Sequence, residues 1–169
     1  MCYTAVGGTN YPAVRSINYP AVNTCEKFQL ANNQWTNLPN MREARGYFNP
    51  CLFSGIIYLC GRGSQVMEAF SPERDDFLRN VQVPVPENEY CCLYVDNDLL
   101  VLHQKSYIVK FAAGQEGQLD KRSEVRSPAV DKPQNCQPVV DKASGFFFIT
   151  YNGQCLRFNM ETGVQGPSV

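Results

Sequence analysis

Cysteine and histidine are the residues of this chain whose types most directly suggest chemistry. The 169 residues include eight cysteines but a single histidine, His103. A structural zinc site normally uses paired ligands such as C-x₂-C, and the adjacent Cys91 and Cys92 would point to opposite faces of a strand. A general base needs a nucleophile or an orienting partner, and the sequence has no G-x-S-x-G motif. The sequence therefore predicts no catalytic residue, no metal site and no cofactor.

The cysteines themselves allow two interpretations, a disulfide scaffold or free thiols packed as small apolar side chains. Cys25, Met67, Ile108 and Cys155 each stand three residues before a phenylalanine. Exchange of cysteine with methionine and isoleucine is typical of buried packing positions. None of the asparagines lies in an N-x-S/T glycosylation signal. We therefore favour free, buried thiols and an intracellular protein.

Charge and hydropathy argue against two classes of partner. Lys and Arg together number 15 and Asp and Glu 16, which gives a net charge of −1. Such a chain lacks the basic surface that nucleic acids and anionic lipids require. It has no apolar run long enough to span a bilayer, and its first residues lack the pattern of a signal peptide. We expect a cytoplasmic protein whose partners are other proteins.

A repeat of about 42 residues organises the sequence. Its markers are Phe28, Phe70, Phe111 and Phe158, which follow one another at intervals of 42, 41 and 47 residues. Each marker ends a short apolar run and is followed by polar turn residues. The runs are rich in β-branched and aromatic residues, and no segment shows a sustained helical stripe. The sequence thus predicts an all-β fold.

Each repeat unit is expected to hold four short strands. The first is a continuous apolar run, the second ends at the marker phenylalanine, the third holds Trp35 or its equivalent, and the fourth carries a cysteine. This pattern gives fourteen strands in units at about 1–54, 55–96, 97–144 and 145–169. Four-stranded antiparallel units of this length are typical of β-propeller blades. Two tandem octapeptides at 9–24 form an inserted loop in the first unit.

The first unit resembles a kelch repeat. A kelch blade typically has a strand ending in Gly-Gly, then a glutamate and an aromatic residue, then a tryptophan, then an arginine after Leu-Pro-x-Met. The residues that fit this order are Gly7, Gly8, Glu26, Phe28, Trp35 and Arg45. The second unit keeps Tyr58, Gly61, Glu68, Phe70 and Phe77. In the later units the resemblance rests on the period and on Phe111 and Phe158.

This resemblance implies an incomplete kelch-type β-propeller of about three and a half blades. Kelch propellers commonly have six blades, so the ring would be completed by further segments of the same protein or by another chain. The implied function is a non-catalytic protein-interaction scaffold, within a larger cytoskeletal or ciliary assembly. One alternative is the substrate-recognition propeller of a ubiquitin-ligase adaptor. A second is a fragment of an oxidase-like or sialidase-like propeller enzyme whose catalytic residues lie outside this chain.

Partner binding is assigned to polar and aromatic residues of the expected loops. The octapeptide loop is either a recognition loop or a tolerated expansion, and the mixed-charge segment 120–126 is either a solvated turn or a site for an acidic peptide. Arginine pockets for acidic peptides are a property that the kelch resemblance implies. The candidate contact residues are Tyr11, Arg15, Tyr19, Arg62, His103, Lys121, Arg122 and Arg126.

Overall fold

The fold is described from a computed structural model of the chain. The ranges that it describes are 2–6, 23–44, 48–61, 66–82, 90–95, 97–103, 107–126, 137–141, 143–151, 154–159, 161–162 and residue 166. They contain fourteen β-strands and one short 3₁₀ turn, η1 (Gln115–Gly117). Within these ranges, no helix has the length and apolar character needed to cross a membrane.

The fourteen strands form four sheets, in which neighbouring strands are antiparallel and follow chain order. Sheet 1 contains β1 (Cys2–Val6), β2 (Cys25–Gln29) and β3 (Gln34–Leu38). Sheet 2 contains β4 (Phe48–Phe53), β5 (Ile56–Gly61), β6 (Val66–Ser71) and β7 (Asp76–Gln82). Sheet 3 contains β8 (Tyr90–Val95), β9 (Asp98–His103), β10 (Tyr107–Ala113) and β11 (Leu119–Arg126). Sheet 4 contains β12 (Gln137–Asp141), β13 (Phe146–Tyr151) and β14 (Gln154–Asn159).

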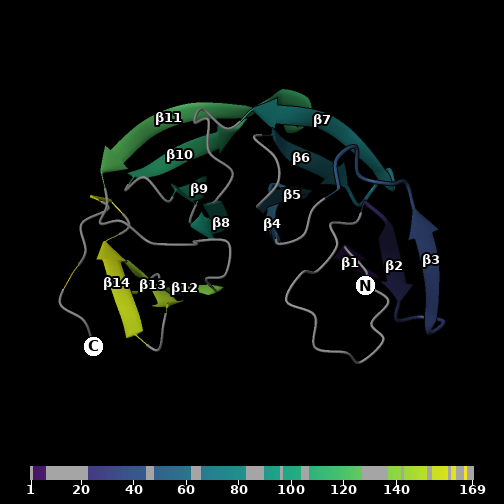
Figure 1. Cartoon of the computed structure of the whole chain (residues 1–169), viewed down its shortest axis with the longest axis horizontal. Coiled ribbons are helices and arrows are strands. Elements are labelled where there is room, and N and C mark those ends of the chain that lie inside the picture. Colours follow the sequence, from purple (N-terminus) through teal and green to yellow (C-terminus); the bar gives the residue numbers. More distant parts are fainter. Residues whose placement is uncertain are drawn as a thin grey trace.

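The sheets stand one after another along an open arc, from sheet 1 at the right of Figure 1 to sheet 4 at the left. In the two middle sheets the first strands, β4 and β8, lie on the inner side of the arc, and β7 and β11 lie on the outer side (Figure 1). Strand β8 contacts both β4 and β5. No described sheet closes on itself, so the described sheets are small and open. The predicted all-β class is confirmed, whereas the propeller is not tested by this topology.

The strands are grouped into sheets differently from the repeat units. Strand β4, which the sequence units place at the end of the first unit, pairs instead with β5 of the second. The reason is the connection between them, since Ser54 and Gly55 have φ angles of 49° and 78°. Two successive residues with positive φ form the tight turn that twists like an antiparallel hairpin. Strands β4 and β8, the cysteine-bearing fourth strands of the first two units, therefore begin sheets instead of ending them.

The hydrophobic core lies between consecutive sheets, where large side chains from two sheets meet. Between sheets 1 and 2, Cys25, Leu38 and Met41 pack against Leu59 and Phe70. Between sheets 2 and 3, the buried residues are Cys51, Phe53, Tyr58, Met67, Ala69, Leu99, Val101, Val109 and Phe111.

Each sheet consequently has two faces with different neighbours. In sheet 2, Leu59 and Phe70 point toward sheet 1, whereas Tyr58 and Met67 point toward sheet 3. This is the alternation that a pleated strand imposes on successive residues. We call the face toward the preceding sheet the leading face and the face toward the following sheet the trailing face.

Candidate interaction site

The marker phenylalanines Phe70 and Phe111 lie on the leading faces of their sheets. Phe70 and Phe111 pack at the junctions with sheets 1 and 2, and their side chains are 0% and 3% exposed. Phe158 is also 0% exposed and stacks on Phe147, with ring centroids 5.1 Å apart. The marker of sheet 1, Phe28, is only partly buried. Sheet 1 therefore differs from the other three at this position.

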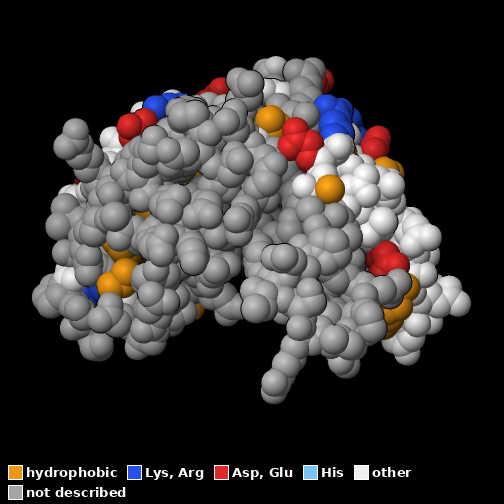
Figure 2. Space-filling view, viewed as in Figure 1, with side chains coloured by type: hydrophobic (Ala, Val, Ile, Leu, Met, Phe, Trp, Pro, Cys, Tyr) orange, Lys and Arg blue, Asp and Glu red, His pale blue; other side chains and the backbone are white. Residues whose placement is uncertain are grey.

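The leading face of sheet 1 carries an aromatic pair whose tryptophan is exposed. Phe28 lies opposite Trp35 in the β2–β3 ladder, and their ring centroids are 5.0 Å apart at a tilt of 45°. Trp35 is 58% exposed, which is unusual for the largest apolar side chain. Figure 2 shows an apolar patch over β2 and β3 beside an acidic group. Glu26, two residues before Phe28 on the same strand, is also exposed.

The same pair in sheet 2 is covered. Phe70 lies opposite Phe77 in the β6–β7 ladder, with ring centroids 5.1 Å apart in an edge-to-face arrangement. Both rings pack into the junction with sheet 1. The pairs Phe28–Trp35 and Phe70–Phe77 thus occupy equivalent places in their sheets. Sheet 1 covers the pair Phe70–Phe77, whereas no sheet in the described part of the chain covers the pair Phe28–Trp35.

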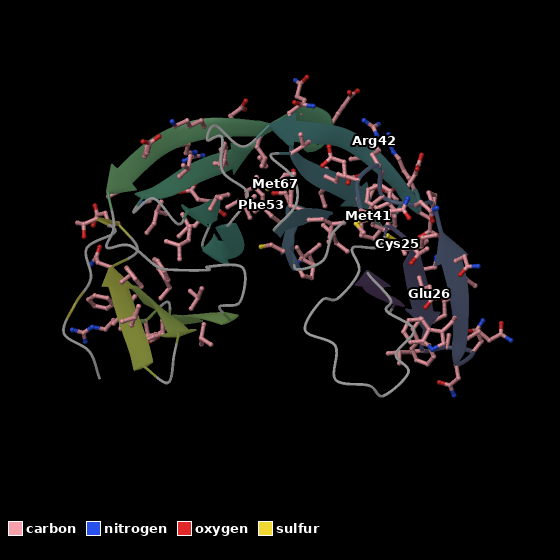
Figure 3. The ribbon with its side chains drawn as sticks, viewed as in Figure 1. Cys25, Glu26, Met41, Arg42, Phe53 and Met67 are labelled. Atoms are coloured by element: carbon pink, nitrogen blue, oxygen red, sulfur yellow. The ribbon has the colours of Figure 1, made fainter. Side chains whose placement is uncertain are left out.

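A glutamate accompanies each of these pairs, and again only one is covered. Glu68 is 1% exposed. It accepts hydrogen bonds from two backbone N–H groups of the segment that follows β3 of sheet 1. The Arg42 N–H reaches its Oε2 at 2.9 Å, and the Glu43 N–H reaches its Oε1 at 3.3 Å. Figure 3 shows Arg42 near the top of this junction and Glu26 lower on sheet 1. Glu26 holds the equivalent place in its sheet but is exposed to solvent.

Three further contacts lie at the junction between sheets 1 and 2, and one of them, the Lys27–Asp75 ion pair, joins the two sheets. Met41, 1% exposed, donates its backbone N–H to the Asn23 carbonyl oxygen at 2.7 Å. Cys25 and Met41 lie together in this junction (Figure 3). Lys27, on the trailing side of β2, forms an ion pair with Asp75 in the turn between β6 and β7. The junction thus combines an apolar centre with polar ties at its margin.

A similar basic tie joins sheets 3 and 4. Lys110 donates from Nζ to the backbone carbonyl oxygen of Glu161 at 3.1 Å. Like Lys27, Lys110 immediately precedes the marker phenylalanine of its sheet. Arg157 holds the same place in sheet 4, where its guanidinium carbon lies 4.6 Å from the centre of the Phe146 ring. The sequence analysis did not identify these basic residues. An alignment of the four marker phenylalanines reveals them, because a basic residue precedes three of the markers and Ala69 precedes the fourth.

Burial makes the described core thiols poor nucleophiles. It raises the pKa of Cys25 to about 11 and that of Cys51 to about 12. The thiolate is the reactive and metal-binding form, so both side chains act as small apolar groups. Cys25, Cys51 and Cys155 are free thiols. Among the described residues, no group of three or more His, Cys, Asp or Glu side chains is placed to hold a metal ion.

The basic residues predicted to bind a partner are engaged with neighbouring acids where their side chains are described. Lys121 Nζ lies 2.7 Å from Glu124 Oε2, and Arg122 Nε lies 3.4 Å from Asp98 Oδ1. All four charged groups belong to sheet 3, and the lysine and the arginine are well exposed on β11. The segment is the solvent-exposed strand β11 and not the solvated turn that the sequence predicted, and the acidic-peptide site stays a prediction.

Two of the other predicted contact residues lie at the same end of sheet 3. His103 ends β9 and Arg126 ends β11, and their backbones both pair with Tyr107. The remaining predicted contacts, and three positions on which the kelch resemblance was based, lie outside the described residues: Tyr11, Arg15, Tyr19, Arg62, Gly7, Gly8 and Arg45.

Tyr58, the tyrosine of the second repeat unit, has a defined structural role. The Tyr58 hydroxyl donates to the Gly117 carbonyl oxygen at 3.2 Å and so links sheet 2 to η1 of sheet 3. Burial raises the pKa of Tyr58 to about 12. Gly61, another of the five positions that the second unit keeps, ends β5.

The comparisons with known proteins give a fold and no family. No model of a known protein family matches the chain, and a search of curated proteins also finds no match. A functionally unknown protein from Desulfotomaculum acetoxidans DSM 771 is 16% identical over 87% of this chain, with a TM-score of 0.65. The hydrazine synthase of Kuenenia stuttgartiensis is 8% identical over 96% of this chain, with a TM-score of 0.64. This chain spans 50% and 52% of the length of those two chains, and the likeness concerns the fold alone.

Proposed function

We propose that the chain is part of a kelch-type β-propeller and acts as a non-catalytic protein-binding module. Four small antiparallel sheets along an arc, with their first strands on the inner side, support the propeller (Figure 1). The glutamate and aromatic positions of the first two units support the kelch type. In this proposal the ring is completed by further sheets, which come from the same protein or from another chain.

The observation that carries the proposal is the exposed face formed by Glu26, Phe28 and Trp35. Tryptophan is among the residues that most often dominate binding energy at protein interfaces. The covered equivalents in sheet 2 indicate what such a face can bind, namely apolar side chains together with free backbone N–H groups. A protein surface with these two features is therefore the expected partner.

Photo-crosslinking from position 35 tests this proposal. A benzophenone amino acid in place of Trp35, in the protein expressed in its source cells, should form a covalent adduct with a protein. The Glu26→Lys variant should lose that adduct, because it removes the acceptor for the partner's N–H groups. Leu52, an apolar side chain 61% exposed, provides the matched control position. Absence of any protein adduct, or an adduct indifferent to Glu26→Lys, would contradict the proposal.

A further inference from the structure

The last strand of each sheet leaves one edge of that sheet open. Strands β3, β7, β11 and β14 are these last strands, and no further described strand pairs with any of them. An edge strand presents unpaired backbone N–H and C=O groups, with which another chain can pair. Proteins commonly protect such edges with charged side chains, with bulges or with a covering segment. The four edges differ in how far they have these protections.

The edges of β7 and β11 are irregular and charged. The pairing register of β6 with β7 shifts between Glu68 and Phe70, and that of β10 with β11 shifts between Lys110 and Phe111. Strand β11 also presents the exposed and mostly charged residues 120–124. A bulge interrupts the ladder and bends the strand, so neither edge offers a straight, neutral backbone to another strand.

The edge of β14 already contacts another part of its own chain. The carbonyl oxygen of Arg157, within β14, accepts a hydrogen bond from the backbone N–H of Gly166 at 2.8 Å. A Cβ on Gly166 would lie only 2.7 Å from Arg157 Nε, so this approach is close. The contact is an example within this molecule of an edge carbonyl that takes a backbone N–H from outside its sheet.

The edge of β3, at the right-hand end of the arc in Figure 1, has none of these protections. Its pairing with β2 is regular from Gln34 to Leu38, and the strand contains no charged residue and no proline. Its first four residues are exposed. The Gln34 N–H meets the Asn32 side chain at 3.3 Å, but no described strand other than β2 pairs with β3. Strand β3 is therefore the edge most suited to adding a strand.

The side chains beside this edge indicate the chemistry of the added strand. A residue placed opposite Trp35 would carry its side chain on the same face of the sheet as that ring, which is 58% exposed. The equivalent aromatic pair of sheet 2 packs with Leu38 and Met41, so an apolar side chain fits this place. Glu26 is exposed and lies opposite Asn37 in the β2–β3 ladder. A basic side chain beside Asn37 would be complementary to it in charge.

We infer that β3 binds an extended segment of a protein partner by strand addition. The backbone of the segment continues sheet 1 beyond β3, and an apolar side chain of the segment lies beside Trp35. Two residues along, a lysine or arginine lies beside Asn37 and reaches toward Glu26. In this mode of recognition main-chain hydrogen bonds give affinity and alternate side chains give specificity. The inference rests on the proposed function, because it names the conformation and the chemistry of the partner segment.

Photo-crosslinking along β3 tests this inference. The benzophenone amino acid is placed at positions 34, 35, 36 and 37 in turn, in the chain expressed in its source cells. The adducts should map to successive residues of one continuous segment of the partner, because paired strands advance together residue by residue. Ser123, an exposed residue of the irregular and charged edge β11, provides the matched control and should give no such series.

A synthetic peptide with the sequence of the crosslinked segment provides a second measurement on the purified chain. Alternate residues of a strand direct their N–H groups toward a given neighbour. N-methylation of one alternate set should therefore weaken binding about tenfold or more, and N-methylation of the other set should have a much smaller effect. Trp35→Ala and Glu26→Lys should each also weaken binding about tenfold. Leu52→Ala, at an exposed apolar side chain of β4, should leave it unchanged.

The outcome can be read separately from that of the proposed function. Adducts that map to unrelated segments, or equal effects of the two N-methylated peptides, would overturn strand addition and leave the proposed function standing, since position 35 would still contact a protein. Adducts between two copies of this chain would overturn the assigned partner. No adduct from any of the four positions would remove both proposals. Unchanged far-ultraviolet circular dichroism of each variant establishes that a lost adduct is not a lost fold.

Discussion

At the scale of single residues, Glu26 and Glu68 occupy equivalent places in sheets 1 and 2 but lie in different environments. Glu68 is buried and accepts two backbone N–H groups, whereas Glu26 is exposed. Hydrogen bonds to a charged acceptor contribute about 1.5–3 kcal/mol each, and a buried donor left without its acceptor is costly. Glu68 is thus a structural tie of the junction between sheets 1 and 2.

We expect Glu68→Gln to lower the free energy of unfolding by about 1–3 kcal/mol. The amide is neutral and holds the Arg42 and Glu43 N–H groups more weakly than the carboxylate does. Urea unfolding at a protein concentration where the chain is monomeric measures the difference. Glu26→Gln, the same substitution at the exposed place, should change stability by less than about 0.5 kcal/mol. Equal losses in the two variants would show that the buried contacts do not matter.

The buried thiols and Tyr58 predict a loss of stability in alkali. Burial raises the pKa of Cys25 to about 11, and those of Cys51 and Tyr58 to about 12, from ordinary values of 9.0 and 10.0. The folded state holds these protons more tightly, so their stabilisation is complete below about pH 9 and is lost as the pH rises toward 11 to 12. Urea unfolding across this range should show the decline.

Cys51→Ala is the matched variant for the alkaline prediction. It removes one of the three titrating groups, so its free energy of unfolding should fall less steeply above pH 9 than that of the parent chain. A parent chain that becomes more stable in alkali, or a variant with an unchanged slope, would contradict the assignment.

At the scale of elements, the turns decide how strands are grouped and how sheets interlock. The turn at Ser54–Gly55 joins β4 to β5 in a hairpin. The 3₁₀ turn η1 reaches from sheet 3 to sheet 2, where its last residue, Gly117, accepts a hydrogen bond from Tyr58. Gly117 has a φ of 75°, and a Cβ there would lie 2.9 Å from Leu78 Cδ1. This glycine therefore serves both the turn and the close approach of two sheets.

Gly117→Ala and Gly55→Ala separate these two requirements. Gly55 has a φ of 78°, and a methyl group added there would meet nothing within 4 Å, so its substitution should lose only the conformational part, about 1–2 kcal/mol. Gly117→Ala should lose about 1–3 kcal/mol more, because the methyl group also meets Leu78. Thermal or urea unfolding of both variants checks the difference. Equal losses would mean that Leu78 moves aside without penalty.

The strands could be predicted from the sequence, whereas their partners could be predicted only in part. Each strand contains an apolar run bounded by turn residues, and that local signal indicated fourteen strands and the markers Phe28, Phe70, Phe111 and Phe158. The pairing of β4 with β5 was also available, since a two-residue connection containing glycine indicates a hairpin.

The junction contacts could not be predicted in the same way. Lys27 meets Asp75 from 48 positions away, and Glu68 meets the Arg42 N–H from 26 positions away. No local pattern relates residues at such separations, because sheet stacking alone brings them together. The exposure of Trp35 could not be predicted either. Trp35 and Phe77 occupy equivalent places in their repeat units, and only the arrangement of the sheets shows that Phe77 is covered by a neighbouring sheet.

At the scale of the whole molecule, the arc is a row of sheets whose described core clusters join consecutive sheets. Figure 1 shows this row with its two ends apart, and the clusters join sheet 1 to sheet 2 and sheet 2 to sheet 3. In such architectures stability is approximately a sum of unit terms and nearest-neighbour terms. Among the described strands, each middle sheet has two neighbouring sheets and each end sheet has one.

Unequal neighbours predict a gradient of amide exchange with deuterium along the row. In β9 the four residues Leu99, Leu100, Val101 and Leu102 are all 0–2% exposed, so their amides should open only with the whole molecule. The strands of sheets 1 and 4 should exchange earlier, because they can detach while sheets 2 and 3 stay folded. Mass-spectrometric exchange of the dilute chain would show this order, and uniform exchange would show one cooperative unit instead. Opening from the ends also defines where a protease would cleave first and where a force applied to either terminus would first unfold the chain. The sheets would unfold one after another from the ends, and the contact between β4 and β8 would break last.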